Sequence, residues 1–313
     1  MKIKLLYFFL PFSTFILAQN DQDKIVYLDS VNKETTIENH SYKRVIKEYY
    51  TEKSEYQVLE YYKSGTLKSE QKSNYKDDGY PIGEEIKYYE NGQKKSSTFY
   101  ENKRKIGIHT EWFENGNLKQ IGKFNPEKFN TNEYYLVETI WNENGTKMVE
   151  SGNGLFDVQK DKIHTKGEYK NGVKNGVWTI TSIEKTYVDE YKDGNFISGY
   201  YTDKNGFMKE YQVLEKKPEP KKGLQHFYKF ISSNFKPTRE AVRNKVKGKI
   251  VLYFVVDKEG KISNIKIARG LGHGLDEEAI NVLEKYPEWF PGEQRGIPVR
   301  CMYSLPITLD FSK

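Results

Sequence analysis

Residues 112–119 read Trp-Phe-Glu-Asn-Gly-Asn-Leu-Lys, and variants of this stretch recur along the chain. Two close copies are Tyr-Tyr-Glu-Asn-Gly-Gln-Lys-Lys at 88–95 and Tyr-Tyr-Lys-Ser-Gly-Thr-Leu-Lys at 61–68, and a weaker copy begins at Trp141. Each copy is typical of a β-hairpin, because glycine adopts the positive φ angle of a tight turn, asparagine tolerates it, and aromatic residues suit a half-buried sheet face. We therefore expect Gly92 and Gly116 to lie in equivalent turns.

A second turn pattern alternates with the first. It runs from Tyr100 to Gly107 and from Tyr169 to Gly176, and with one extra residue from Tyr75 to Gly83 and from Tyr191 to Gly199. Repeats with a period of about 20–50 residues build stacked units, none of which buries its apolar face alone. We predict a mainly β array of stacked hairpins over residues 56–215, preceded by capping strands over residues 19–55.

The composition agrees with such an array. The chain has 313 residues, of which 25 are tyrosines, and its mean hydropathy is −0.82. These values favour thin sheets faced with amphipathic rings over a thick aliphatic core. The 50 Lys and Arg residues are interspersed with 44 Asp and Glu residues. A nucleic-acid surface needs clustered basic residues, so we expect no nucleic-acid partner.

The alternation of Tyr-x-Asn-Gly elements with Gly-x-x-x-x-Tyr/Trp-Tyr/Phe elements resembles the MORN-variant repeats of a family of antitoxin-like proteins. The resemblance covers roughly half of the chain and concerns architecture. It implies a role in binding lipid or protein, because MORN repeats have been linked to both. A spacer or scaffold without a ligand of its own is the alternative for this region.

The first 18 residues have the features of a secretory signal. Lys2 and Lys4 precede an apolar run from Leu5 to Ala18, and Ala18 is a small residue at a cleavage position before Gln19. The run is shorter than the roughly 20 residues that a membrane-spanning helix needs. We predict a signal peptide at 1–18, cleavage before Gln19, and a periplasmic protein; an uncleaved anchor in the inner membrane is the alternative.

The sequence changes character after residue 215. Residues 216–222 read Lys-Lys-Pro-Glu-Pro-Lys-Lys, which predicts an extended linker. Within residues 223–313, helical patterns at 227–234 and 238–245 precede a β-branched strand at 249–256. A turn at 257–260, a strand at 262–268, an amphipathic helix at 275–286 and a strand at 299–311 follow. We predict a small α+β domain with a ββαβ core and leading helices.

This second domain resembles the C-terminal domain of TonB energy transducers. The resemblance covers about 85 residues and rests on spaced elements that occur in the family's order: Gly248-x-Ile250-x-x-x-Phe254-x-Val256, Gly260-x-Ile262, Leu275-Asp276-x-Glu278-Ala279, Pro287-x-Trp289-x-Pro291-Gly292, Gly296-x-Pro298-Val299 and Leu305-Pro306-Ile307. The leading helix of the family also fits Phe230-Ile231-x-x-Asn234-Phe-x-Pro237-x-x-Ala241.

The resemblance implies a periplasmic domain that binds a short segment of an outer-membrane transporter by adding it as a strand to a sheet edge. The edge strand corresponds to Val299, Arg300, Cys301, Met302, Tyr303, Ser304 and Leu305. Membrane-associated partners follow from the same resemblance. A force-transmitting transducer also needs a membrane-spanning N-terminal helix and a long Pro-rich arm. This sequence has a cleavable signal and a linker of about 25 Å, so we expect peptide recognition without force transmission.

Signatures of catalysis and of cofactor binding are missing from the sequence. Gly270, Gly272 and Gly274 follow a predicted strand, but the spacing of a dinucleotide loop would place the third glycine at position 275. Cys301 is the only cysteine, so no internal disulfide and no cysteine-based metal site is expected. We predict a non-enzymatic protein without cofactor or metal that recognises a transporter or other envelope protein segment. The alternative is an envelope scaffold whose array binds lipid, glycan or protein.

Overall fold

The computed structural model of the chain describes residues 22–77, 79–131, 133–286 and 288–312. The predicted signal peptide at 1–18 and the cleavage site before Gln19 lie outside these ranges. Among the described residues, no helix is both long and apolar enough to cross a membrane.

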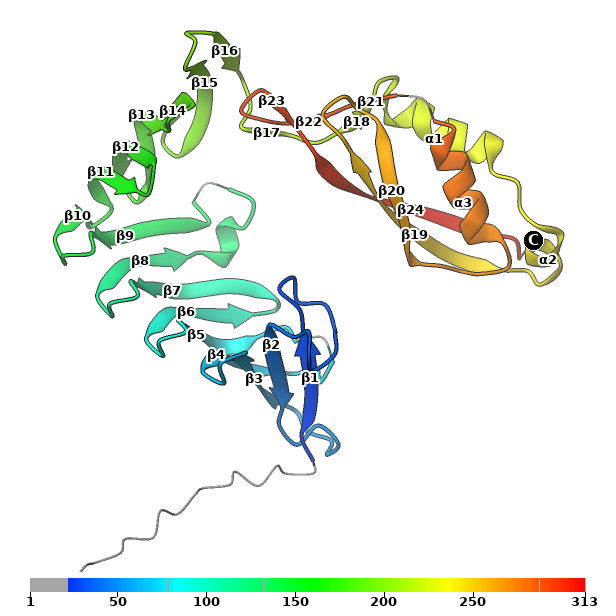
Figure 1. The fold of residues 1–313 in the computed structure, drawn as a ribbon, viewed down its shortest axis with the longest axis horizontal. Helices are drawn as coiled ribbons and strands as arrows, with labels where there is room; N and C mark the ends of the chain where they lie inside the picture. The colour runs from blue at the N-terminus through cyan, green and yellow to red at the C-terminus, as the bar shows by residue number, and fades with distance from the viewer. Residues whose placement is uncertain (1–21, 78, 132, 287, 313) are drawn as a thin grey trace, which may run out of the picture. The chain divides into compact units, whose positions relative to one another are not determined.

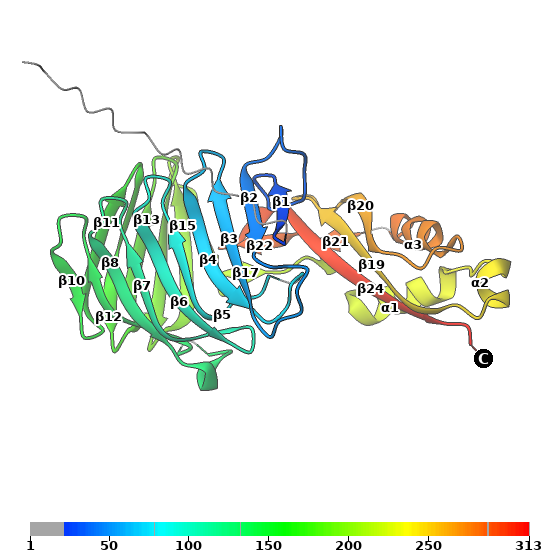
Figure 2. The same cartoon turned by 90° about the horizontal axis from the view of Figure 1, so that it is seen from below.

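In the described part of the chain, sixteen antiparallel strands form one sheet in which each strand pairs with its neighbours in chain order (Figure 1). They are β1 Lys24–Leu28, β2 Tyr42–Ile46, β3 Tyr56–Tyr62, β4 Leu67–Ser73, β5 Ile82–Tyr88, β6 Lys94–Glu101, β7 Arg104–Trp112, β8 Leu118–Phe124, β9 Tyr135–Trp141, β10 Lys147–Glu150, β11 Asn153–Lys160, β12 Ile163–Lys170, β13 Val173–Thr181, β14 Lys185–Lys192, β15 Asn195–Asp203 and β16 Met208–Tyr211. A short 3₁₀ helix, η1 Pro126–Lys128, interrupts the β8–β9 connection. Strands β3 to β8 lie side by side in Figure 2. The predicted hairpin array is confirmed.

The Asn-Gly and Ser-Gly motifs form one recurrent turn. In the hairpin β5–β6, the Tyr89 N–H donates to the Gln93 carbonyl at 2.8 Å, and the Gly92 N–H donates to the Tyr89 carbonyl at 3.0 Å. Gly92 has a φ of 85° and Gly116 a φ of 86°. Both glycines are therefore in the left-handed conformation that the sequence predicted, and the two turns are equivalent.

The second pattern combines a tight turn with a bulge. Asn102 and Lys103 have φ angles of 50° and 63°, as the central pair of a type I′ turn requires. Gly107, with a φ of 61°, lies inside β7. There the register with β6 shifts between Thr98 and Phe99. A glycine here accommodates the extra residues of a β-bulge.

Aromatic rings resting on glycines replace an aliphatic core in parts of the array. A Cβ at Gly122 would lie 2.4 Å from the Tyr135 hydroxyl, and one at Gly199 would lie 2.5 Å from the Tyr211 ring. The ring fills the space that the glycine leaves on the neighbouring strand. Each pair thereby buries one face of an aromatic ring against the backbone of the adjacent strand.

The described chain divides into two compact units, and the division falls inside the array. One unit extends to Gly154 and includes Tyr169–Val173, and the other comprises Leu155–Glu168 and the chain from Lys174 onward. The second unit therefore contains the last array strands together with the C-terminal domain.

The C-terminal domain has the predicted α+β fold. Its elements are β17 Glu215–Lys216, β18 Glu219–Pro220, α1 Gly223–Asn234, α2 Arg239–Arg243, β19 Lys247–Val256, β20 Ile262–Arg269, α3 Leu275–Glu284, β21 Trp289–Phe290, β22 Gly292–Gln294, β23 Ile297–Val299 and β24 Cys301–Asp310. The main sheet has the order β20-β19-β24. Its core side packs against α1 and α3 through buried residues such as Phe227, Leu252, Phe254 and Leu283.

The segment predicted as a linker forms two short strands. Strand β17 pairs with β22, and β18 pairs with β21. Pro218 and Pro220 are buried. These contacts hold residues 215–220 against the C-terminal domain.

Candidate functional site

Strand β24 lies at the edge of the main sheet. It pairs with β19 in an unbroken register from Lys247↔Asp310 to Val256↔Cys301. In the described part of the chain, no strand pairs with its other side. Such an edge presents a row of backbone N–H and C=O groups to an incoming strand.

The structure distributes the seven predicted edge residues over three places. Val299 ends β23 and pairs with Gly292, Arg300 lies between the strands, and Cys301 to Leu305 form the first half of β24. Along β24 the side chains alternate between the two faces of the sheet. Leu305 is buried and Cys301 and Tyr303 are half-buried, whereas Ser304 is exposed and Met302 is 73% exposed.

Pro306 indicates which backbone groups of β24 face away from β19. Proline has no N–H to donate, and within sheets its nitrogen points away from the neighbouring strand. Pairing in an antiparallel sheet alternates from residue to residue, so the N–H groups of Met302 and Ser304 share this orientation. We infer that these two residues offer their backbone groups to the open edge.

A groove of about 660 Å³ runs along this part of the edge. One wall consists of the consecutive residues 299–304. A groove on one face of a strand would contact alternate residues, and no described residue of β19 lines this one. The groove therefore follows the open edge of β24. Its other wall comes from residues 215–218 and from Glu293 and Gln294.

Gly292 brings the two walls together. A Cβ at this position would lie 2.3 Å from the Cys301 Sγ, 3.2 Å from the Lys216 carbonyl oxygen and 3.3 Å from the Pro218 ring. Any side chain here would force β24 and the segment 215–218 apart. The absence of a side chain at position 292 thus allows Cys301 and the segment 215–218 to approach each other.

The wall that contains β22 is tied to the last strands of the array, within the second unit. The Arg295 Nη2 donates to the Asp189 Oδ2 at 2.9 Å, and the Arg295 Nε lies 3.2 Å from the same oxygen. The Arg295 N–H also donates to the Leu214 carbonyl at 2.7 Å. Lys209 donates through its Nζ to the Gly296 carbonyl at 2.5 Å. The β22–β23 turn is therefore held from several sides.

The carboxylate of Asp189 is almost completely buried, with a side-chain exposure of 1%. Burial and the charge of Asp189 raise the pKa of Tyr191 to about 12. Burial and the hydrogen bond that Tyr211 donates to Asp189 also raise the pKa of Tyr211. Burial alone would lower the pKa of Arg295, but its hydrogen bonds to Asp189 raise it. The Arg295 guanidinium and the hydroxyls of Tyr191 and Tyr211 therefore surround the buried carboxylate of Asp189.

Asp189 and Arg295 were not predicted from the sequence, although the repeats contain a signal for Asp189. Residues 167–172 read Gly-Glu-Tyr-Lys-Asn-Gly, and residues 189–194 read Asp-Glu-Tyr-Lys-Asp-Gly. The position of Gly167, against which the Trp178 ring rests, is thus occupied by an aspartate in the next copy. A charged residue at a buried repeat position requires a partner. No comparable pattern identifies Arg295.

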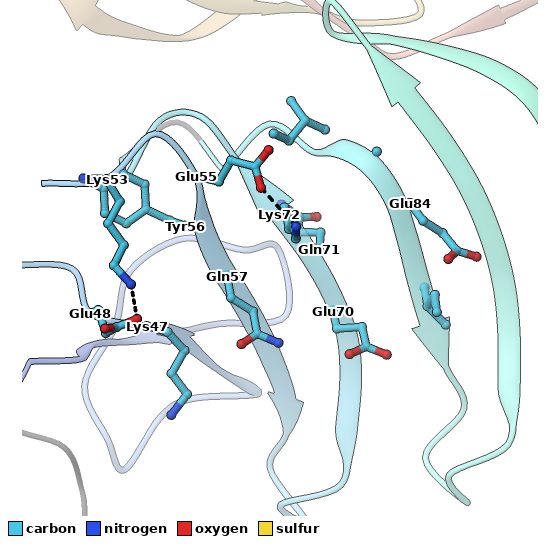
Figure 3. A pocket seen from close by; sticks show the side chains of 13 residues that line it. Lys47, Glu48, Lys53, Glu55, Tyr56, Gln57, Glu70, Gln71, Lys72 and Glu84 are labelled. Atoms are coloured by element: carbon cyan, nitrogen blue, oxygen red, sulfur yellow. Dashed lines mark hydrogen bonds and ion pairs between the residues drawn. The ribbon is translucent and has the colours of Figure 1, made fainter. Parts of the chain in front are cut away.

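A second hollow, of about 730 Å³, lies on strands β3 to β5 of the first unit (Figure 3). Its charged residues are paired within the chain. Lys72 contacts Glu55 at 3.0 Å, and Lys53 contacts Glu48. Glu84 accepts a hydrogen bond from the Ser97 hydroxyl at 2.6 Å. These charged groups already have partners within the chain, so the hollow does not indicate a particular ligand.

A family model supports the assignment of the second domain. A search of the curated proteins gives no match. Among solved structures, the NMR solution structure of the Helicobacter pylori TonB-CTD is 16% identical, with a TM-score of 0.22, and the match covers 28% of this chain and 78% of that one. The resemblance of the array to MORN repeats stays a prediction. Residues 238–310 match the family model described as Gram-negative bacterial TonB protein C-terminal, and this part of the chain is therefore similar to that family.

Proposed function

We propose that the protein is a non-enzymatic, periplasmic binding protein that recognises an extended segment of an outer-membrane transporter or another envelope protein. The segment adds as a strand to the open edge of β24. Backbone hydrogen bonds supply affinity in this binding mode, and side chains beside the edge supply selectivity. The protein would support TonB-dependent transport without transmitting force itself.

One observation carries this proposal. The first half of β24 is an edge strand whose outer side has no strand partner among the described residues, and a groove follows it. The family match over residues 238–310 supports a protein partner from the envelope. The alternative, a scaffold whose array binds lipid, glycan or protein, has less support, because the charged groups of the array hollow are already paired.

Photo-crosslinking in intact cells tests the proposal. A photoreactive phenylalanine analogue replaces Ser304 in the full chain, and the adducts are identified by mass spectrometry. We expect adducts with an outer-membrane transporter or another envelope protein. Adding Met302→Pro should abolish them, because the proline removes a backbone donor on the open edge.

Thr308→Pro is the matched control. Thr308 is exposed and shares the alternation of Met302 and Pro306, but it lies outside the groove. This variant should fold and retain the adducts. Adducts that persist equally in the Met302→Pro chain would contradict strand addition at this edge.

A further inference from the structure

The segment before the family-matched region lies against the candidate binding site. Residues 215–218 precede the matched residues 238–310, yet they form one side of the groove beside β24. The two pairs Glu215↔Gln294 and Lys216↔Glu293 fix this segment to β22. An extended chain in the groove would therefore contact β24 on one side and residues 215–218 on the other.

The position of this outer wall depends on the array. Strand β22 leads directly into Arg295, which is bound to the buried Asp189 of β14. The Arg295 N–H bonds the Leu214 carbonyl, one residue before β17. Arg295 thus contacts the array through its side chain, and through its backbone it links the end of β22 to the residue before β17. No other ion pair between described residues joins β22 or β23 to the array strands.

We propose that residues 215–218 are a specificity-determining wall of the peptide groove, and that the Asp189–Arg295 pair holds this wall in place for an extended polypeptide segment. This inference rests on the proposed strand addition at β24. It assigns a binding role to the segment between array and domain, and a positioning role to the end of the array.

The groove is lined by charged side chains that a bound peptide would meet. Lys217 is exposed and lines the groove, as does Arg300 on the opposite wall. Lys216 is already engaged, with its Nζ 3.3 Å from Glu219. The stretch Cys301–Ser304 spans about 13 Å at roughly 3.3 Å per residue, so Lys217 faces a few residues of a bound strand. A charged side chain on one of these residues should be attracted or repelled by Lys217, according to its sign.

The test uses the full chain and two acetylated, amidated peptides. One reads Ser-Thr-Val-Thr-Glu-Thr-Val-Thr-Ser, and the other has Lys in place of the central Glu. Dissociation constants are measured by fluorescence titration. We expect Lys217→Glu to change the ratio of the two constants roughly tenfold in favour of the Lys peptide. The new carboxylate attracts the Lys peptide, which Lys217 repelled, and repels the Glu peptide, which Lys217 attracted.

Asp189→Asn tests the positioning role. This variant should weaken the binding of both peptides, because the wall is no longer held beside the peptide. When Asp189→Asn is present, Lys217→Glu should change the ratio of the two dissociation constants by less than half of the change it causes in the otherwise unaltered chain. Asp310→Asn is the control. Asp310 forms an ion pair with Lys247 at 2.8 Å at the far end of the same sheet, and its loss should leave both constants unchanged. Circular dichroism verifies that each variant is folded.

The outcomes separate the two proposals. If both peptides bind and Lys217→Glu leaves their ratio unchanged, residues 215–218 are not a wall of the site, and the inference is wrong while strand addition stands. If the ratio changes equally with and without Asp189→Asn, the positioning role is wrong. If neither peptide binds the unaltered chain, strand addition at β24 itself is contradicted.

Discussion

Arg295 and Asp189 are 106 residues apart in sequence, and their side chains meet with an Nη2–Oδ2 distance of 2.9 Å. The aspartate is buried, and the exposure of the Arg295 side chain is 22%. Removing one member of a buried ion pair leaves an uncompensated charge, which costs more than the pair contributes as a whole. The two residues should therefore behave as one unit in the stability of the chain.

Replacing Arg295 should destabilise the protein more than replacing an exposed cation. We expect Arg295→Met to lower the free energy of unfolding by about 3 kcal/mol, because Asp189 stays buried without its partner. Lys247→Met, which breaks the exposed pair with Asp310, should cost much less, because exposed ion pairs are screened by solvent. Urea unfolding of both variants gives the comparison.

The double variant Asp189→Asn with Arg295→Met completes this measurement. Since the two residues contact each other, its cost should be smaller than the sum of the single costs by at least about 1 kcal/mol. Additive costs would mean that the two residues are not energetically coupled.

Glu111 should make the stability of the array depend on pH in the acidic range. Its carboxylate accepts from the His109 Nε2 at 3.2 Å and from the Lys119 Nζ at 2.6 Å. The hydrogen bond from His109 lowers the pKa of Glu111, and so does that from Lys119, whereas burial raises it. Together they lower this pKa from 4.5 to about 2. The folded pKa lies below the unfolded one, so the stabilisation is complete above about pH 4.5 and is lost as the pH falls towards 2.

Glu111→Gln should therefore destabilise the chain at pH 7 and progressively less at pH 4 and pH 3. At pH 7 we expect a cost of about 1 kcal/mol, a value reduced for solvent screening because 32% of the Glu111 side chain is exposed. Glu114→Gln, on the exposed turn of the same hairpin, serves as control and should have little effect at any of these pH values. A difference between the two variants that stays constant from pH 7 to pH 3 would contradict the role of Glu111.

The sequence was most informative where structure is local. The glycine of each Asn-Gly turn predicted a positive φ, and Gly92 and Gly116 have one. The turn from Asp257 to Gly260 was also predicted, and the Gly260 N–H donates to the Asp257 carbonyl at 3.1 Å. Both follow from conformational preferences that act within a few residues.

Residues 215–220 and Val299 show why the groove was harder to predict. Glu215–Lys216 and Glu219–Pro220 are strands of two residues, too short for any periodicity. They exist because β21 and β22 provide partners about 70 to 80 residues later in the chain. Val299 belongs to β23 rather than β24 because Arg300 interrupts the pairing. Such details depend on tertiary contacts, which override local preference.

The turn glycines allow a matched test of backbone strain. A Cβ at Gly92 would have no heavy atom within 4 Å, whereas one at Gly116 would lie 3.2 Å from the Gln93 Oε1. Gly92→Ala therefore isolates the cost of the left-handed conformation, which is about 1–2 kcal/mol. Gly116→Val adds the side-chain contact and β-branching, so it should cost more than Gly92→Ala in urea unfolding.

Gly92→Asn should be better tolerated than Gly92→Ala, because asparagine adopts the left-handed conformation more readily. Asn32 provides a precedent, since it has a φ of 62° and its N–H donates to the Asp29 carbonyl in a turn of the same kind. Equal costs for the two Gly92 variants would show that backbone strain is not the cause.

Tyrosine hydroxyls connect successive hairpins of the first unit. The Tyr62 hydroxyl donates to the Tyr88 carbonyl at 2.8 Å, and the Tyr89 hydroxyl donates to the Trp112 carbonyl at 2.9 Å. Tyr62 and Tyr89 occupy the same position of equivalent turns, and Phe113 occupies that position in the next turn. The position therefore accepts a phenylalanine ring without loss of the turn.

Tyr89→Phe should keep the fold and remove only the hydrogen bond between hairpins. The expected loss in the free energy of unfolding is about 1 kcal/mol, the usual net value for one such bond, because the Trp112 carbonyl loses its donor. Tyr50→Phe is the control, since the Tyr50 side chain is 70% exposed and its hydroxyl is free to bond water. Urea unfolding should separate the two variants, and equal midpoints would show that contacts between hairpins do not depend on the Tyr89 hydroxyl.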